Sequence, residues 1–124
     1  MYNQMVVEHE LTDDEVDRLF QALADATRRD IVTRVLRQEQ SVSALAGHYA
    51  MSFAAVQKHV AVLERAALVT KQRRGREQVV HAAPDTLRRA ARLLESYEEL
   101  WRGRAHRIDD LLAEEVLPGD RGAE

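Results

Sequence analysis

Two groups of polar and basic side chains in the middle of the chain have the chemistry to bind a polyanion. The first group begins at Ser52 and presents Gln57 and Lys58, and the second is the run Arg73-Arg74-Gly75-Arg76. Gln offers a paired donor and acceptor to adenine, and Lys donates to guanine or to phosphate. Arginines on a loop bind the phosphate backbone or enter a narrow minor groove. Both groups therefore predict contact with nucleic acid, although a charged surface helix without a partner would carry similar residues.

A helix from Ser52 to about Ala66 must position the first group. At 100° per residue, one stripe of this helix is apolar and predicts a core face, formed by Val56, Val60, Leu63 and Ala67. The opposite side carries Ala54, Lys58, Ala61 and Arg65, with Gln57 and His59 at its flanks. Small alanines let such a helix lie close to DNA, and Ser52 with the free N–H groups of the first turn can bind a phosphate. His59 flanks the core stripe, so an internal hydrogen bond is an alternative to DNA contact.

The surrounding pattern predicts a mainly α-helical chain with a small β-hairpin wing, a winged helix-turn-helix. Thr12 and Glu15 have the spacing of a capping box, and Asp25, Ser43 and Ser52 are the expected N-caps of three further helices. Residues 68–71 and 77–81 are expected strands around the basic turn, and Pro84 begins a long last helix. We expect residues 1–11 to be an N-terminal arm, residues 12–116 to be the folded domain and residues 117–124 to be a tail.

Composition excludes several classes of protein and site. The 124 residues contain no cysteine, so thiolate metal sites, disulfides and cysteine nucleophiles are absent. No apolar run reaches the roughly 18 residues of a membrane span, and the first residues do not resemble a signal peptide. We therefore expect a soluble, cytoplasmic domain. Neither a catalytic constellation nor a phosphate-binding glycine loop is present, so we expect no enzyme activity and no cofactor.

The net charge of −3 conceals an uneven distribution. Residues 40–83 carry six Lys and Arg side chains against the two acidic residues Glu64 and Glu77, whereas residues 109–124 carry one Arg against six acidic residues. A basic centre between acidic ends is typical of a polyanion-binding middle segment.

Three motifs that follow one another in the chain resemble the ArsR/SmtB family of bacterial repressors. They are ALADATRRDIV (22–32), SVSALAGHYAMSFAAVQKHVAVLERAALV (41–69) and KQRRGREQVVH (71–81). The last helix, with Tyr97, Trp101 and a dense mixture of Arg and Glu, looks most like the SdpR-like branch, which does not sense metals. Ala67 stands where the family usually has glycine, which implies a cost of roughly 1 kcal/mol if the backbone there is left-handed. Gln57 stands where serine is common, which implies a different base preference.

The resemblance implies a homodimer that binds double-stranded DNA and represses transcription of its own or a neighbouring operon. It implies DNA contacts from the recognition helix and the wing, namely Ser52, Ala54, Gln57, Lys58, His59, Arg73, Arg74 and Arg76. It also implies a dimer interface on the first and last helices, where the apolar candidates are Val16, Leu19, Phe20, Leu94, Tyr97, Trp101 and Ile108. The operator of such a dimer is expected to be pseudo-palindromic.

Two other functions stay open at this point. A metal-responsive repressor would need ligands such as His106 with Asp109 or Asp110, which is a weak set without cysteine, and we expect no metal site. A protein-interaction module could keep the fold without binding DNA. The sequence also leaves open a small-molecule effector, because Tyr97 and Trp101 could line a pocket as well as an interface.

Overall fold

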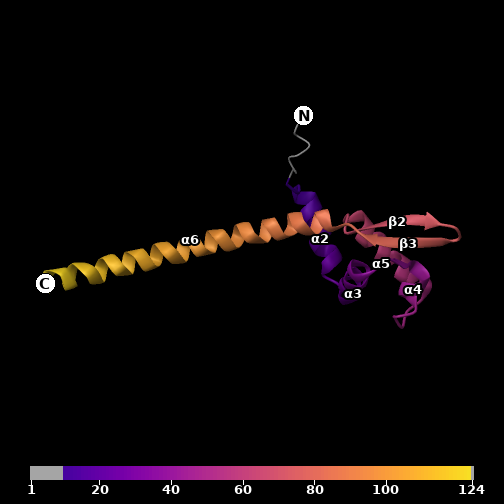
Figure 1. The fold of residues 1–124 in the computed structure, drawn as a ribbon, viewed down its shortest axis with the longest axis horizontal. Helices are drawn as coiled ribbons and strands as arrows, with labels where there is room; N and C mark the ends of the chain where they lie inside the picture. The colour runs from indigo at the N-terminus through magenta and orange to yellow at the C-terminus, as the bar shows by residue number, and fades with distance from the viewer. Residues whose placement is uncertain (1–9, 124) are drawn as a thin grey trace, which may run out of the picture. The chain divides into compact units, whose positions relative to one another are not determined.

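The computed structural model describes residues 10–123, with the side chains of residues 10–114. Its elements are α2 (Asp13–Leu23), α3 (Ala26–Arg37), β1 (Gln40–Ser41), α4 (Val42–Ala46), α5 (Phe53–Arg65), β2 (Val69–Arg74), β3 (Glu77–Ala82) and α6 (Pro84–Ala123) (Figure 1). This order of helices around a β-hairpin is the predicted winged helix-turn-helix. The chain divides into two compact units between Ala90 and Ala91.

Local hydrogen bonds cap the N-termini of the four helices α2 to α5, which belong to the compact unit that ends at Ala90. Thr12 Oγ1 accepts the N–H of Glu15 at 3.2 Å while the N–H of Thr12 donates to Glu15 Oε1 at 2.8 Å, so the predicted capping box is confirmed. Asp25 and Ser52 cap α3 and α5 as predicted. The cap of α4 is a correction, because Ser41 and not Ser43 accepts the N–H of Ala44, at 3.0 Å.

The sheet has three antiparallel strands in the order β1-β3-β2, one more than the predicted hairpin. Strand β2 pairs with β3 from Val69↔Ala82 to Arg74↔Glu77, and the two residues of β1 pair with Val79 and Val80. A two-residue strand has too little periodicity to be recognised in the sequence. Strand β1 nevertheless joins the segment before α4 to the edge of β3 that does not pair with β2.

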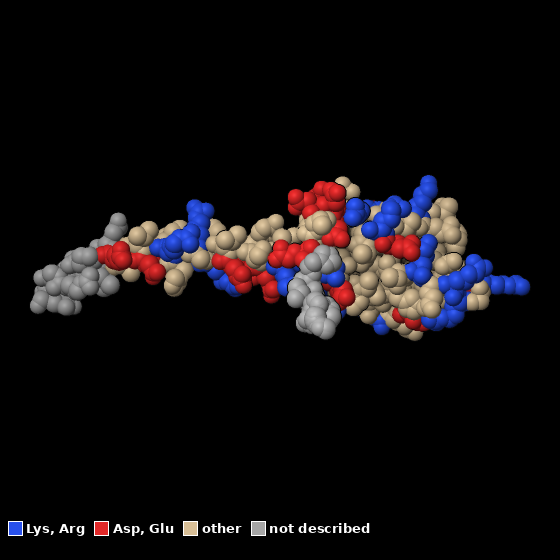
Figure 2. All heavy atoms as spheres, turned by 90° about the horizontal axis from the view of Figure 1, so that it is seen from above, with Lys and Arg blue, Asp and Glu red and all other residues tan. Residues whose placement is uncertain are grey.

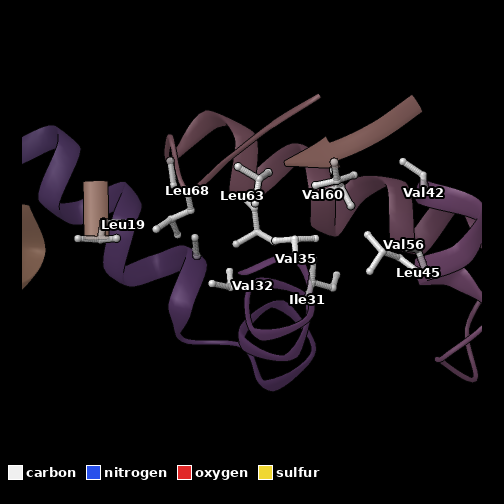
Figure 3. Packing of buried hydrophobic residues seen from close by; sticks show 14 of the residues in the cluster. Leu19, Ile31, Val32, Val35, Val42, Leu45, Val56, Val60, Leu63 and Leu68 are labelled. Carbon is white, nitrogen blue, oxygen red and sulfur yellow. The ribbon is translucent and has the colours of Figure 1, made fainter. Parts of the chain in front are cut away.

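One apolar core holds the compact unit together (Figure 3). Val56, Val60 and Leu63 of α5 are completely buried, as predicted, whereas Ala67, the fourth residue of the predicted core stripe, lies beyond the helix and is exposed. They pack with buried side chains of the neighbouring elements, among them Leu19, Ile31, Val32, Val35, Val42, Leu45 and Leu68. Leu36, near the end of α3, lies outside this core and is 49% exposed.

Helix α5 ends in a Schellman motif built on an alanine. The N–H of Leu68 donates to the carbonyl of Leu63 at 3.0 Å, and the N–H of Ala67 donates to the carbonyl of Glu64 at 2.9 Å. Ala67 has a φ of 60°, the left-handed conformation that glycine adopts without strain. The predicted strain at Ala67 is therefore present, and it lies where the recognition helix turns toward β2.

Beyond Ala90 the second unit is the remainder of α6, which continues through Gly103 to Ala123. Its backbone includes residues 117–123 of the expected tail, whereas residues 1–9 of the expected arm lie outside the described part. Several large apolar side chains on this unit are exposed, namely Leu94, Tyr97, Leu100, Trp101, Ile108, Leu111 and Leu112. No helix among the described residues is long and apolar enough to cross a membrane.

Candidate nucleic-acid interface

The exposed face of α5, with its N-cap, carries four of the eight residues predicted to contact DNA. Ser52, Ala54, Gln57 and Lys58 are all exposed, and Ala54 and Lys58 lie on the side of the helix opposite the buried Val56. Ser52 Oγ accepts the N–H of Ala55 at 3.0 Å, so the hydroxyl fixes the start of the helix. Within the described part of the chain, the Lys58 and Gln57 side chains form no hydrogen bond or ion pair. These side chains are therefore available to a partner without first breaking an internal contact.

His59 differs from its neighbours on α5 because its side chain is half-buried and has an internal partner. Its Nδ1 lies 3.1 Å from Nη1 of Arg28 and 3.9 Å from Oδ2 of Asp25. A guanidinium only donates, so Nδ1 accepts this hydrogen bond and the neutral ring carries its proton on Nε2. His59 therefore makes the internal contact that the sequence left open, which holds α5 against α3, and its contact with DNA stays a prediction.

Arg28 connects three helices, a role that the sequence did not reveal. Its Nε donates to the carbonyl of Ala22 at 2.8 Å and its Nη2 to the carbonyl of Gln21 at 3.0 Å, both in the last turn of α2. Its third contact is His59 of the recognition helix. The N–H of Arg28 also donates to Asp25 at 2.9 Å, which lowers the pKa of that carboxyl. Arg28 is therefore a positioning residue between the α2 end and α5.

A second network holds the segment before α5 against α3. The Tyr49 hydroxyl donates to Asp30 Oδ2 at 2.6 Å, and Nε of Arg34 donates to the same oxygen at 2.7 Å. Both hydrogen bonds lower the pKa of Asp30, and the bond from Tyr49 has the larger effect. Burial and the Asp30 carboxylate raise the pKa of Tyr49 to about 12. The network fixes the turn of the helix-turn-helix from its side, which positions the first turn of α5.

The turn of the basic hairpin contains fewer residues than predicted. Arg73 and Arg74 lie in β2, and only Gly75 and Arg76 form the turn. Gly75 has a φ of 65°, which suits the first central residue of a two-residue hairpin turn. Figure 2 shows Lys and Arg side chains projecting at the end of the compact unit where this hairpin turns.

The three arginines of the hairpin are not equivalent. Arg74 Nη1 donates to Glu39 Oε2 at 2.7 Å, which lowers the pKa of Glu39, and Glu39 Oε1 also lies 3.0 Å from Nδ1 of His81. Arg73 and Arg76 are exposed and form no ion pair within residues 10–114. Arg73 and Arg76 are therefore free to bind an anion, whereas Arg74 must first leave Glu39.

Proteins with a similar fold are transcriptional regulators. The structure is similar to an ArsR-like transcriptional regulator from Rhodococcus sp. RHA1, with 34% identity, coverage of 82% of this chain and 93% of that chain, and a TM-score of 0.74. The chain belongs to the ArsR family of transcriptional regulators.

Two further relatives of this ArsR-family chain add detail. The HTH-type transcriptional regulator Rv2034 of Mycobacterium tuberculosis is 41% identical over 71 residues, which are 57% of this chain and 66% of that regulator. Mb0332 of Mycobacterium bovis, described as a homodimeric winged helix-turn-helix DNA-binding domain, is 25% identical and covers 74% of this chain and 92% of that one, with a TM-score of 0.57. No protein-family model matches the sequence. The relatives are regulators, a non-enzymatic role, as predicted, but they do not identify the SdpR-like branch, which stays a prediction.

The side chains predicted for the dimer interface of this ArsR-family chain differ in how far they are exposed. Leu19 is a correction, because it is completely buried in the chain's own core and has no surface to offer a partner. Val16 is half-buried and Phe20 is 40% exposed on α2. On α6, Leu94, Tyr97, Trp101 and Ile108 are all exposed, and Arg104 Cζ lies 5.6 Å from the Trp101 ring centre.

The candidate metal ligands do not gather into a site. His106 Nε2 lies 3.8 Å from Oδ2 of Asp110, and both side chains are largely exposed. Among the described residues, no group of three or more His, Cys, Asp or Glu side chains is placed to hold a metal ion. This exposed pair has the ordinary geometry of a contact four residues apart on a helix.

Proposed function

We propose that this ArsR-family chain is a homodimeric repressor that binds a pseudo-palindromic operator in double-stranded DNA. The observation that carries the proposal is the exposed, unpaired polar face of α5, supported from behind by a fully buried stripe and by Arg28. Two such helices in one dimer would enter successive major grooves about 34 Å apart. Repression would follow because the bound dimer blocks a promoter of its own or a neighbouring operon, in the cytoplasm.

Each exposed residue of α5 has a separate role in this proposal. Gln57 reads a base edge, since its amide matches the donor and acceptor of adenine. Lys58 and Ser52 bind phosphates, which positions the helix without reading sequence. The small side chain of Ala54 allows the helix to lie close to the DNA in the major groove.

The hairpin would hold the DNA beside the major groove. Lys58, Arg73 and Arg76 of two protomers give about six phosphate contacts, and Arg74 raises this to about eight if phosphate displaces Glu39. The slope of log K against log salt concentration would then be roughly −5 without Arg74 and roughly −7 with it. The salt dependence therefore reports whether the Arg74–Glu39 ion pair opens on binding.

The homodimer rests on the exposed apolar side chains of α2 and α6. Leu94, Tyr97, Trp101 and Ile108 follow a repeat of about 3.5 residues, the spacing at which helices of two chains pack side by side. Phe20 and Val16 add apolar surface on α2. A monomer would leave these aromatic and aliphatic side chains in water.

The test is fluorescence anisotropy with duplexes from the chain's own upstream region and with a random duplex, over a series of salt concentrations. Lys58→Ala should weaken binding to every duplex and make the salt slope less steep by about 2 per dimer. Gln57→Ala should mainly remove the preference for one duplex. Arg88→Ala removes the same charge outside α5 and the hairpin and serves as the control. An equal loss on all duplexes for both α5 variants would contradict these separate roles.

The same titration separates the alternatives. Binding that zinc weakens and a chelator restores would favour the metal-responsive repressor and its ligands His106 and Asp109. Equal and weak binding to every duplex would contradict the operator proposal. A search for protein partners, with the α5 and hairpin residues replaced by alanine, would then test the interaction module.

A further inference from the structure

A small hollow lies at the end of the compact unit away from the hairpin turn. It has a volume of about 60 Å³ and is lined by residues of α2, the end of α5 and the first turns of α6. Strand β2 starts beside it at Val69 and ends before the turn at Arg74, five residues later, which is roughly 17 Å of extended chain. The hollow is therefore separate from the surface proposed to contact DNA.

Three arginines line this hollow, one from each of the three helices: Arg18, Arg65 and Arg89. Within the described residues, none of the three side chains has a hydrogen bond or ion pair. Among the described residues, Glu15 is the only acidic side chain in the lining, and its Oε1 accepts the N–H of Thr12 in the capping box. The lining thus has an excess of positive charge and an unused set of donors.

Arg89 gives the strongest indication of a missing acceptor. Its Nε is buried and has no hydrogen-bond partner among the described residues. Leaving a buried donor unpaired costs free energy, so such donors are rare unless an ion or water meets them. Arg65 alone has another explanation, because a cation in the last turn of α5 interacts favourably with the helix dipole. That explanation does not apply to Arg89, which lies in the second turn of α6.

We propose that this hollow binds a small oxyanion or carboxylate through Arg89, Arg18 and Arg65. The planar guanidinium fork matches phosphate, sulfate and carboxylate groups, and the volume has room for a few water molecules or one such group. Thr86, a buried residue in the first turn of α6, adds a hydroxyl and the positive end of a helix dipole to the lining.

A bound anion would link the recognition helix to two other elements. It would touch α2, the residue that ends α5, and α6, next to the strained Ala67 that leads to β2. This inference rests on the proposed function. An anion that prefers one arrangement of these helices would shift the affinity for DNA, and the hollow would then be an effector site.

The first experiment measures anion binding without DNA, with inorganic phosphate, sulfate and acetate as probes and sodium chloride of equal ionic strength as the reference. Spectra of ¹⁵N-labelled protein report the arginine Nε–H groups directly. We expect the Arg89 signal to move and saturate with at least one probe while that of Arg88, which pairs with Asp85, does not. The melting temperature should rise by roughly 4–8 °C at about ten times Kd.

Variants locate the effect. Arg89→Gln and Arg18→Gln should each remove the rise in melting temperature, and Arg88→Gln should retain it. Arg18 is exposed, so its variant tests the site even if Arg89→Gln folds poorly. Equal effects of every probe and chloride, or an unchanged response of Arg18→Gln, would overturn the site.

The second experiment adds the DNA duplex at constant ionic strength. We expect the saturating anion to change the Kd for DNA at least about five-fold in the wild type and not in Arg89→Gln. Binding of the anion with no change in Kd would overturn its role as an effector. Failure to bind DNA at all would contradict the proposed function and leave the first experiment standing.

Discussion

The compact unit and the part of α6 beyond Ala90 carry similar apolar stripes, but the stripe of the compact unit is buried and that of the helix is exposed. In the compact unit the stripe of α5 is completely buried against α2, α3 and α4, whereas Trp101 of the long helix is 60% exposed. The difference teaches that a periodic stripe predicts a buried face without saying which chain buries it. The first unit buries its stripe within its own chain, whereas the stripe of the long helix stays exposed and is the surface that we propose a second molecule covers.

The largest expected effect separates dimerisation from folding. Trp101→Glu should raise the dissociation constant of the dimer by 100-fold or more, because truncating a central aromatic costs about 2–4 kcal/mol in each protomer. Ser96→Glu adds the same charge at an exposed position off the stripe and should leave the dimer intact. Analytical ultracentrifugation measures both. A monomeric Ser96→Glu protein, or a dimeric Trp101→Glu protein, would contradict the assignment of this face.

The next effect belongs to the compact unit. Arg28→Ala removes three charge-assisted hydrogen bonds and should lower the free energy of unfolding by about 2 kcal/mol, with weaker DNA binding because α5 loses its contact through His59. Arg29→Ala removes a single bond to the carbonyl of Leu23 and is the matched control. Denaturant titration and anisotropy report the two effects. Equal losses in both variants would show that Arg28 does not connect the helices specially.

A smaller effect is expected at Tyr49 and depends on pH. Tyr49→Phe should lower the free energy of unfolding at pH 7 by about 1 kcal/mol, discounted because Asp30 is partly exposed. The hydrogen bonds that lower the pKa of Asp30 stabilise the fold above the ordinary carboxyl pKa of 3.8, and this contribution is lost as pH falls through the lowered value. The difference between the proteins should therefore be constant above about pH 5 and close in stronger acid. Denaturant titrations at pH 3, 5 and 7 test it, and a difference that widens in acid would contradict the role of Asp30.

The smallest effect has the opposite sign. Ala67→Gly should stabilise the compact unit by about 1 kcal/mol, because glycine adopts the left-handed conformation without strain. Ala66→Gly, one residue earlier with a φ of −82°, should destabilise the unit and is the control. Thermal unfolding of both variants measures the change. A destabilised Ala67→Gly protein would mean that the alanine methyl contributes more than the backbone strain costs.

Much of the fold was predictable because it depends on residues close together in the chain. The capping box at Thr12, the caps at Asp25 and Ser52 and the stripe of α5 all rest on spacings of three to seven residues. The exposed candidates Gln57 and Lys58 followed from the same periodicity. Even the left-handed Ala67 could be expected, since the family pattern places glycine there.

The features that the sequence did not predict are contacts between distant residues. Arg28 meets His59 across 31 positions and Arg74 meets Glu39 across 35, and no local pattern distinguishes these arginines from their neighbours. Leu19 shows the same limit, because its place on an apolar stripe predicted an interface while the chain's own core buries it. Pairing in three dimensions decided each of these outcomes.

The two residues of β1 have a consequence for how the hairpin binds. A hairpin attached only at its base would swing, and a ligand would have to immobilise it at the expense of conformational entropy. Here Gln40 and Ser41 bind the outer edge of β3 at Val80 and Val79, immediately before α4 begins. The hairpin and the helix-turn-helix therefore share a rigid joint, so the basic turn is already preorganised with respect to α5 before any DNA arrives.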